Sequence, residues 1–66
     1  MLFAEWSGHI VKVYQENRQI LREIRARKDV RCVQCSGEGN DGVIAITLEN
    51  GKTDVYRATG QIIRQG

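Results

Sequence analysis

The sequence of 66 residues contains no proline, one histidine, one tryptophan, one phenylalanine and two cysteines. It also lacks any run of about 18 apolar residues, the length that a helix needs to cross a bilayer. Its first twelve residues, MLFAEWSGHIVK, carry an acid in their apolar part and no basic leader, which argues against a signal peptide. We therefore expect a cytoplasmic protein without a membrane partner.

Motifs of the common enzyme classes are missing as well. The single histidine, His9, has no acid near it in a motif with serine or cysteine, and the stretch GEGNDG lacks the lysine and the following helix of a phosphate-binding loop. A cysteine nucleophile with His9 as its base is the one catalytic arrangement left open. We expect a non-catalytic protein that needs no cofactor.

Cys32 and Cys35 form a C-x-x-C pair, a pattern found in zinc half-sites and redox pairs. A structural zinc needs four ligands, and His9 is the only further good candidate. The pair lies in the alternating segment VRCVQC, and strand residues three apart point to opposite faces. We expect two free thiols and no metal, with a zinc site or a disulfide between subunits as the alternative.

The clearest local signal is the segment GVIAITLENGKTDVYRA. Asn50 and Gly51 lie between two runs rich in β-branched residues, which is typical of a two-residue type I′ hairpin loop. The register set by such a loop pairs Ile46 with Val55. One face of the hairpin then carries Ile44, Ile46, Leu48 and Val55. The other face carries Val43, Ala45 and Tyr56.

The chain also repeats itself. Residues 13–23, VYQENRQILRE, match residues 55–65, VYRATGQIIRQ, at an offset of 42. The identities are Val13, Tyr14, Gln19, Ile20 and Arg22, and the alternation of residues 2–6 matches that of 44–48 without a gap. Residues 15–28 taken alone resemble a helix, with Ile20, Leu21 and Ile24 at helical spacing, but the glycine-broken second copy favours strands.

We therefore expect an all-β chain: an antiparallel meander in one domain, 1–66, with three strands in repeat one (1–25) and four in repeat two (30–66). The predicted strands are 2–6, 9–15, 18–25, 30–35, 42–49, 52–58 and 61–65, with a loop over 36–42.

A period of about 40 to 45 residues built from four short antiparallel strands resembles the blade of a β-propeller. Residues 30–65 are similar to one complete blade, and residues 2–24 to a blade without its first strand. The resemblance is architectural and points to no named family, because the Trp-Asp dipeptide of one propeller family is absent. It implies a homo-oligomer, since two blades cannot close a ring and three chains would supply six. A small β-barrel or sandwich is the alternative.

Net charge is only +2, but cations are concentrated in the fourteen residues 18–31. Such a segment attracts phosphates, although a solvated edge strand has the same pattern. Arginines near aromatic rings suit a nucleotide or nucleic acid, because guanidinium groups bind phosphates and bases stack on rings. The candidate ligand-binding residues are Trp6, His9, Tyr14, Arg18, Arg31 and Arg57.

The sequence also allows two other functions. The first is a protein-interaction, inhibitor or assembly protein, encoded by a phage or mobile element, to which very short chains often belong. The second is a carbohydrate-binding ring, because tryptophan and tyrosine also recognise sugars. The aromatic residues stand at alternating positions, which is more often a sign of burial in a core.

Overall fold

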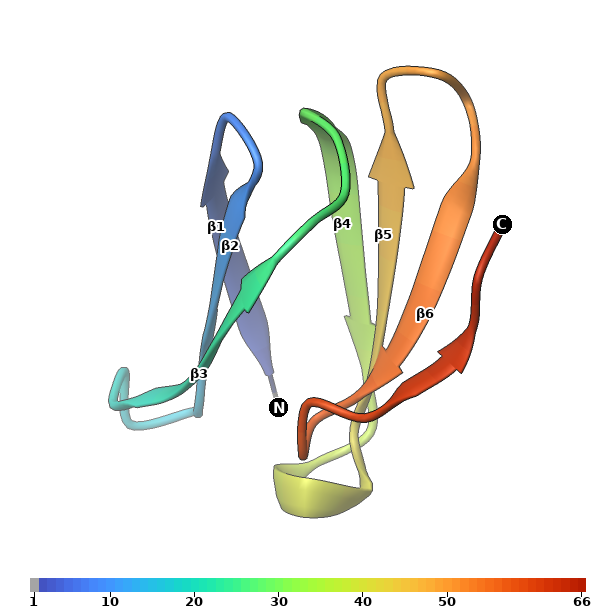
Figure 1. Cartoon of the computed structure of the whole chain (residues 1–66). Helices are drawn as coiled ribbons and strands as arrows, with labels where there is room; N and C mark the ends of the chain where they lie inside the picture. The colour runs from blue at the N-terminus through green and yellow to red at the C-terminus, as the bar shows by residue number, and fades with distance from the viewer. Residues whose placement is uncertain (1) are drawn as a thin grey trace.

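The computed structural model describes residues 2–66 and shows two antiparallel sheets (Figure 1). Residue 1, the first of repeat one, lies outside the described residues. The first sheet has the order β1 (Phe3–Ser7), β2 (Ile10–Tyr14) and β3 (Ile20–Arg25). The second has the order β4 (Val30–Ser36), β5 (Val43–Leu48), β6 (Thr53–Arg57) and β7 (Ile62–Arg64), with a 3₁₀ turn, η1 (Gly39–Asp41), between β4 and β5.

The predicted fold class is confirmed: an all-β antiparallel meander of three strands followed by four. The helical alternative for residues 15–28 is wrong, because β3 occupies Ile20–Arg25. A β-bulge explains why that strand was hard to recognise. Tyr14 pairs with Ile20 and Val13 with Arg22, so Leu21 is an extra residue that breaks the two-residue alternation. No described residue belongs to a helix long and apolar enough to cross a membrane.

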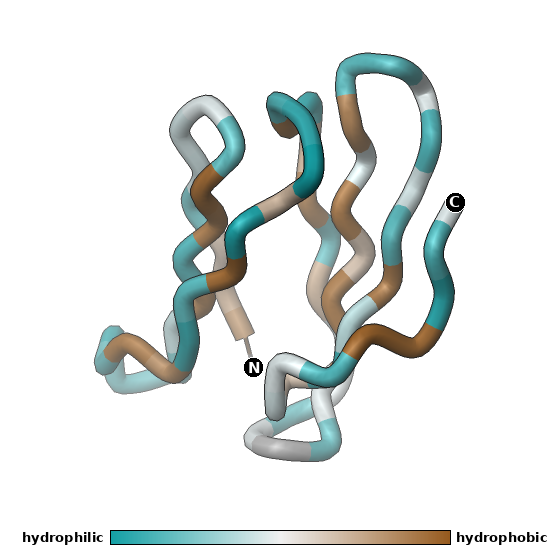
Figure 2. The backbone as a smooth tube through the Cα atoms, in the orientation of Figure 1, coloured by the Kyte–Doolittle hydropathy of each residue, from teal (hydrophilic) through white to brown (hydrophobic). Residues whose placement is uncertain are grey.

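One hydrophobic core lies between the two sheets, and both contribute to it. Its buried residues are Leu2, Val11, Val13, Ile24, Ala26, Val30, Ile44, Ile46, Leu48 and Ala58. Figure 2 shows hydrophobic and hydrophilic residues alternating along the central strands. Because alternate strand residues face opposite sides, each sheet turns one face to this core and leaves the other uncovered by residues 2–66.

The register of the β5–β6 hairpin differs from the prediction by one residue. The amide of Gly51 donates to the carbonyl of Leu48 over 2.9 Å, and the amide of Leu48 donates to the carbonyl of Lys52 over 2.8 Å. The loop therefore has three residues, Glu49 to Gly51, with positive φ only at Gly51 (+85°). This is a type I turn followed by a left-handed residue, not the predicted type I′ loop.

A shift of one residue turns the whole of β6 over. Ile46 pairs with Asp54 rather than with Val55, and Ile44 pairs with Tyr56. The prediction that Val55 shares the core face is therefore wrong, and so is the prediction that Tyr56 lies on the outer face. Burial raises the pKa of Tyr56, in keeping with its packing against the core.

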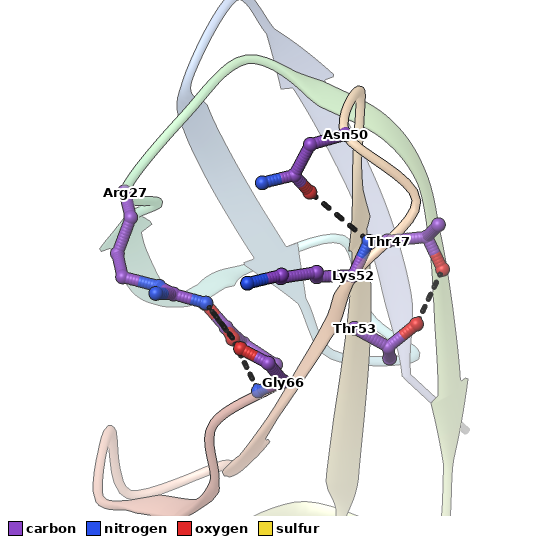
Figure 3. A network of polar contacts seen from close by, with 7 residues as sticks. Arg27, Thr47, Asn50, Lys52, Thr53 and Gly66 are labelled. Atoms are coloured by element: carbon purple, nitrogen blue, oxygen red, sulfur yellow. Dashed lines mark hydrogen bonds and ion pairs between the residues drawn. The ribbon is translucent and has the colours of Figure 1, made fainter.

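Asp54, which the corrected register brings to the core face, forms a polar link between the sheets with Arg27. Figure 3 shows Arg27 and Gly66 converging in this network. The Asp54 carboxylate is 1% exposed and accepts hydrogen bonds from Arg27 Nε over 3.0 Å and Arg27 Nη2 over 2.8 Å. The amide of Gly66 donates to the same carboxylate over 3.0 Å. These contacts, the Arg27 hydrogen bond first, hold the pKa of Asp54 below its ordinary value of 3.8. Arg27 follows β3, so the pair joins the first sheet to the second.

The internal repeat is present in the turns that follow the two Val-Tyr pairs. Both turns contain the same two hydrogen bonds at an offset of 42 residues: Gln15 N to Gln19 O and Arg57 N to Gln61 O, then Arg18 N to Gln15 O and Gly60 N to Arg57 O. The register also breaks at the same place in both sheets, between Val13 and Tyr14 and between Val55 and Tyr56.

Upstream of these turns the repeat loses its register. The β1–β2 loop has two residues, Gly8 and His9, because Ser7 pairs with Ile10, whereas the β5–β6 loop has three. Val13 is consequently buried in the core, while its sequence counterpart Val55 lies on the outer face opposite Ala45. The gapless repeat predicted over the whole hairpin is therefore wrong.

Candidate functional site

A depression of about 510 Å³ opens on the first sheet and is lined by Phe3, Ala4, Glu5, Tyr14 and Arg18. The first three residues belong to β1, Tyr14 ends β2, and Arg18 lies in the loop that follows. We refer to this depression as the Phe3–Arg18 groove. Its volume lies within the range of small-molecule sites, about 300–1,000 Å³.

Two aromatic rings lie next to each other in the groove. Phe3 and Tyr14 are cross-strand partners in the β1–β2 ladder, so their Cβ atoms are about 5 Å apart. Both are on the outer face of the sheet, because their neighbours Ala4 and Val13 pair on the core side. Phe3 is 46% exposed, which leaves ring surface available for stacking against a planar ligand.

Arg18 has an unusual backbone conformation for its residue type. Three hairpin loops of this chain share one three-residue form, in which the third residue is left-handed; these residues are Arg18 (φ +67°), Gly51 (φ +85°) and Gly60 (φ +96°). A left-handed residue with a Cβ atom costs about 1–2 kcal/mol, and two of the loops avoid this cost with glycine. Arg18 is the only non-glycine among the described residues with positive φ.

The loop around Arg18 is otherwise a close copy of the β5–β6 loop. Residues 16–18 read Glu-Asn-Arg and residues 49–51 read Glu-Asn-Gly. In each, the asparagine side chain accepts a hydrogen bond of 3.0 Å from the amide two residues later, Asn17 from Gln19 and Asn50 from Lys52. The two loops thus differ mainly in their third residue, where arginine replaces the less strained glycine.

The charged side chains of the groove are not used by the fold. Within residues 2–66, neither Arg18 nor Glu5 makes a side-chain hydrogen bond or ion pair. The strain at Arg18 is therefore not repaid by a structural contact in this part of the chain. Backbone strain that serves no packing purpose is characteristic of functional positions.

Of the six candidate residues from the sequence, the structure brings Tyr14 and Arg18 together in the groove. Trp6, 39% exposed, lines a neighbouring depression of about 140 Å³ together with Glu5. His9 is exposed in the β1–β2 loop, where its carbonyl accepts the amide of Ala26 over 2.7 Å.

The two remaining candidates are on the second sheet and do not line the groove. Arg31 is the exposed extra residue at a bulge in β4. Arg57 is exposed at the end of β6, on the outer face opposite Val43. Neither is placed to act with Tyr14 and Arg18 on one small ligand.

The basic segment 18–31 does not form one continuous patch. Arg22 Nε donates to the carbonyl of Ala58 over 2.8 Å, and Arg27 is paired with Asp54. Both cations therefore connect the two sheets. Arg25 Nε lies 4.0 Å from Glu23 Oε1. This leaves Arg18 as the cation of the segment that lines the groove.

Sequence reasoning missed three groove residues, Phe3, Ala4 and Glu5. A usable signal was present for Phe3, because a two-residue loop at Gly8-His9 places it opposite Tyr14 in the ladder. No comparable signal existed for Glu5, whose role depends on the shape of the groove.

Cys32 and Cys35 are both free thiols. Cys32 pairs with Thr47 on the outer face and Cys35 with Ile44 on the core face, so the prediction that they point apart is confirmed. Burial raises the pKa of the Cys35 thiol. Among the described residues, no three histidine, cysteine or acidic side chains are grouped closely enough to hold a metal ion.

The sequence matches no known family, and comparisons with curated protein sequences and with solved structures find no match.

Proposed function

We propose that this chain is a small, non-catalytic all-β module that binds a nucleotide-type ligand in the Phe3–Arg18 groove. The observation that carries the proposal is Arg18, an arginine held in a strained left-handed conformation, without a side-chain partner among residues 2–66, beside two aromatic rings. Guanidinium groups bind phosphate through strong charge-assisted hydrogen bonds. Phe3 and Tyr14 supply the surface on which a base stacks.

The ligand chemistry is one base and one phosphate, in either a free nucleotide or a single-stranded nucleic acid. Stacking contributes about 1–3 kcal/mol per base, and a hydrogen bond to a charged group about 1.5–3 kcal/mol. The sum corresponds to a Kd of roughly 0.04–15 mM for one nucleotide. Nucleotide ligands also fit the cytoplasmic location predicted from the sequence.

A nuclear magnetic resonance titration of the ¹⁵N-labelled chain tests the proposal. Mononucleotide added at low salt should shift the amide signals of Phe3, Tyr14 and Arg18, and added salt should reverse the shifts because a phosphate contact is screened. A six-nucleotide single strand forms the second arm. If it binds much more tightly than the mononucleotide, the natural ligand is nucleic acid.

Two matched variants control for charge. Arg18→Gln should abolish the shifts, whereas Arg57→Gln removes the same charge from an exposed position on the other sheet and should leave them unchanged. Equal weakening by both variants would mean that the ligand responds only to net charge. That result, or no shifts at millimolar nucleotide, contradicts the proposal.

Self-association and the ring of blades belong to the same proposal. The outer edge of β7 pairs with no other described strand, and Ile62 and Ile63 beside it are 43% and 47% exposed, a hydrophobic segment visible in Figure 2. Free edges with exposed apolar residues recruit partners. Light scattering should give three times the chain mass of 7.5 kDa for the trimer, and a folded monomer at micromolar concentration would exclude the ring.

A further inference from the structure

We infer that Glu5 selects the base bound in the Phe3–Arg18 groove and that the preferred base is guanine. The inference rests on the proposed function and adds a specificity to it. Glu5 lines this groove together with Phe3 and also lines the neighbouring depression together with Trp6. Its side chain therefore stands at the border between the two, beside the rings on which a base would stack.

The position of Glu5 along β1 matches the size of a base. Phe3 and Glu5 are two residues apart in one strand, so they project from the same face about 6.6 Å from each other. A base stacked over Phe3 thus brings one polar edge to Glu5. The carboxylate is available for it, because Glu5 is exposed and its side chain makes no hydrogen bond or ion pair within residues 2–66.

The chemistry of a carboxylate then decides between the bases. An ionised carboxylate only accepts hydrogen bonds, through two oxygens that suit a pair of parallel donors. Guanine presents two adjacent donors, the N1 hydrogen and the 2-amino group. The donor edge of adenine or cytosine combines one amino group with a ring acceptor, and that of uracil places one donor between two acceptors. Guanine alone satisfies both oxygens of Glu5.

The test compares guanosine monophosphate with inosine monophosphate, which keeps the N1 hydrogen and lacks the 2-amino group. We expect the wild-type chain to bind the guanosine nucleotide about 3- to 10-fold more tightly, which is the effect of one ordinary hydrogen bond, because the carboxylate stays exposed to solvent. In Glu5→Gln this ratio should fall to about one, because the amide has one acceptor oxygen and an NH2 group that only donates, so it cannot receive two parallel donors. Using the ratio cancels the general effect of removing a negative charge near a phosphate.

Glu23→Gln is the matched control. Glu23 shares the outer face with Glu5, since both pair with Lys12, but Glu23 does not line the groove. The control should keep the wild-type ratio, and thermal unfolding of both variants checks that they are folded. Equal binding of the two nucleotides by the wild-type chain, or an unchanged ratio in Glu5→Gln, overturns the role of Glu5 and leaves the proposed function intact. Failure of every nucleotide to bind overturns the proposed function itself.

Discussion

The substitution Arg18→Gly separates stability from function at a single position. It converts the loop Glu16-Asn17-Arg18 into the Glu-Asn-Gly sequence that the chain already uses at 49–51. The left-handed conformation of Arg18, φ +67°, costs about 1–2 kcal/mol for a residue with a Cβ atom. Glycine removes this cost but loses about 0.5–1 kcal/mol through the greater freedom of its unfolded state. We expect a net gain of about 0.5–1 kcal/mol in the free energy of unfolding.

A gain of this size is measurable because the chain is small. A change of 1 kcal/mol shifts the Tm of a domain of this size by about 4–8 °C, so Arg18→Gly should unfold about 2–8 °C above the wild type. Circular dichroism follows the loss of the sheets, and urea titration gives the free energy directly. In the same variant the groove has lost its cation, so nucleotide binding should disappear.

Arg18→Gln is the control for this pair of effects. It removes the charge but keeps a Cβ atom in the left-handed conformation, so its stability should stay within about 0.5 kcal/mol of the wild type while binding is lost. The reasoning is refuted if Arg18→Gly is less stable than the wild type, since the side chain would then have a structural role. Wild-type affinity in Arg18→Gly would refute the binding role instead.

Three further predictions concern the core and the cysteines. The hydrogen bond from Arg27 lowers the pKa of Asp54 below 3.8, so the ionised pair stabilises the fold above about pH 4. This stabilisation is lost as the pH falls through the lowered pKa. The urea midpoint of Asp54→Asn should therefore fall less between pH 4 and the lowered pKa than that of the wild type. Gly42→Ala should lose about 1–3 kcal/mol in urea unfolding, since the added methyl group would meet Leu2 in a packed core, and unchanged stability would show that Leu2 can move away. Cys35 should react with iodoacetamide more slowly than Cys32, because burial raises the pKa of the Cys35 thiol. Mild oxidation should not join the two cysteines within one chain, and an intramolecular disulfide would contradict the strand assignment. Peptide mass spectrometry measures both outcomes.

The strands could be predicted from the sequence because their signals are local. Asn50-Gly51, Thr59-Gly60 and Ser7-Gly8-His9 mark turns, and alternation marks the segments between them. The β5–β6 register could not be read in the same way, because Asn-Gly suits both a two-residue and a three-residue loop. The choice is decided by packing between distant segments, notably by Asp54, which needs Arg27 as its partner to be buried.

The groove was only half predictable for the same reason. Tyr14 and Arg18 are close in sequence and belong to the basic and aromatic pattern of the chain. Phe3 and Glu5 join them through strand pairing, which composition does not reveal. The basic segment 18–31 suggested more free positive charge than the structure has, because Arg22 and Arg27 are used to connect the two sheets.

The extra residue in the β5–β6 loop has a consequence for how roles are transferred between similar sequences. Tyr14 and Tyr56 occupy equivalent positions in an ungapped alignment and precede turns of the same geometry. One nevertheless faces outward into the groove, and the other packs against the core. A change of one residue in loop length thus exchanges the core and outer faces for every side chain of the next strand. Residue identity between the two sheets therefore does not show that two side chains have the same role.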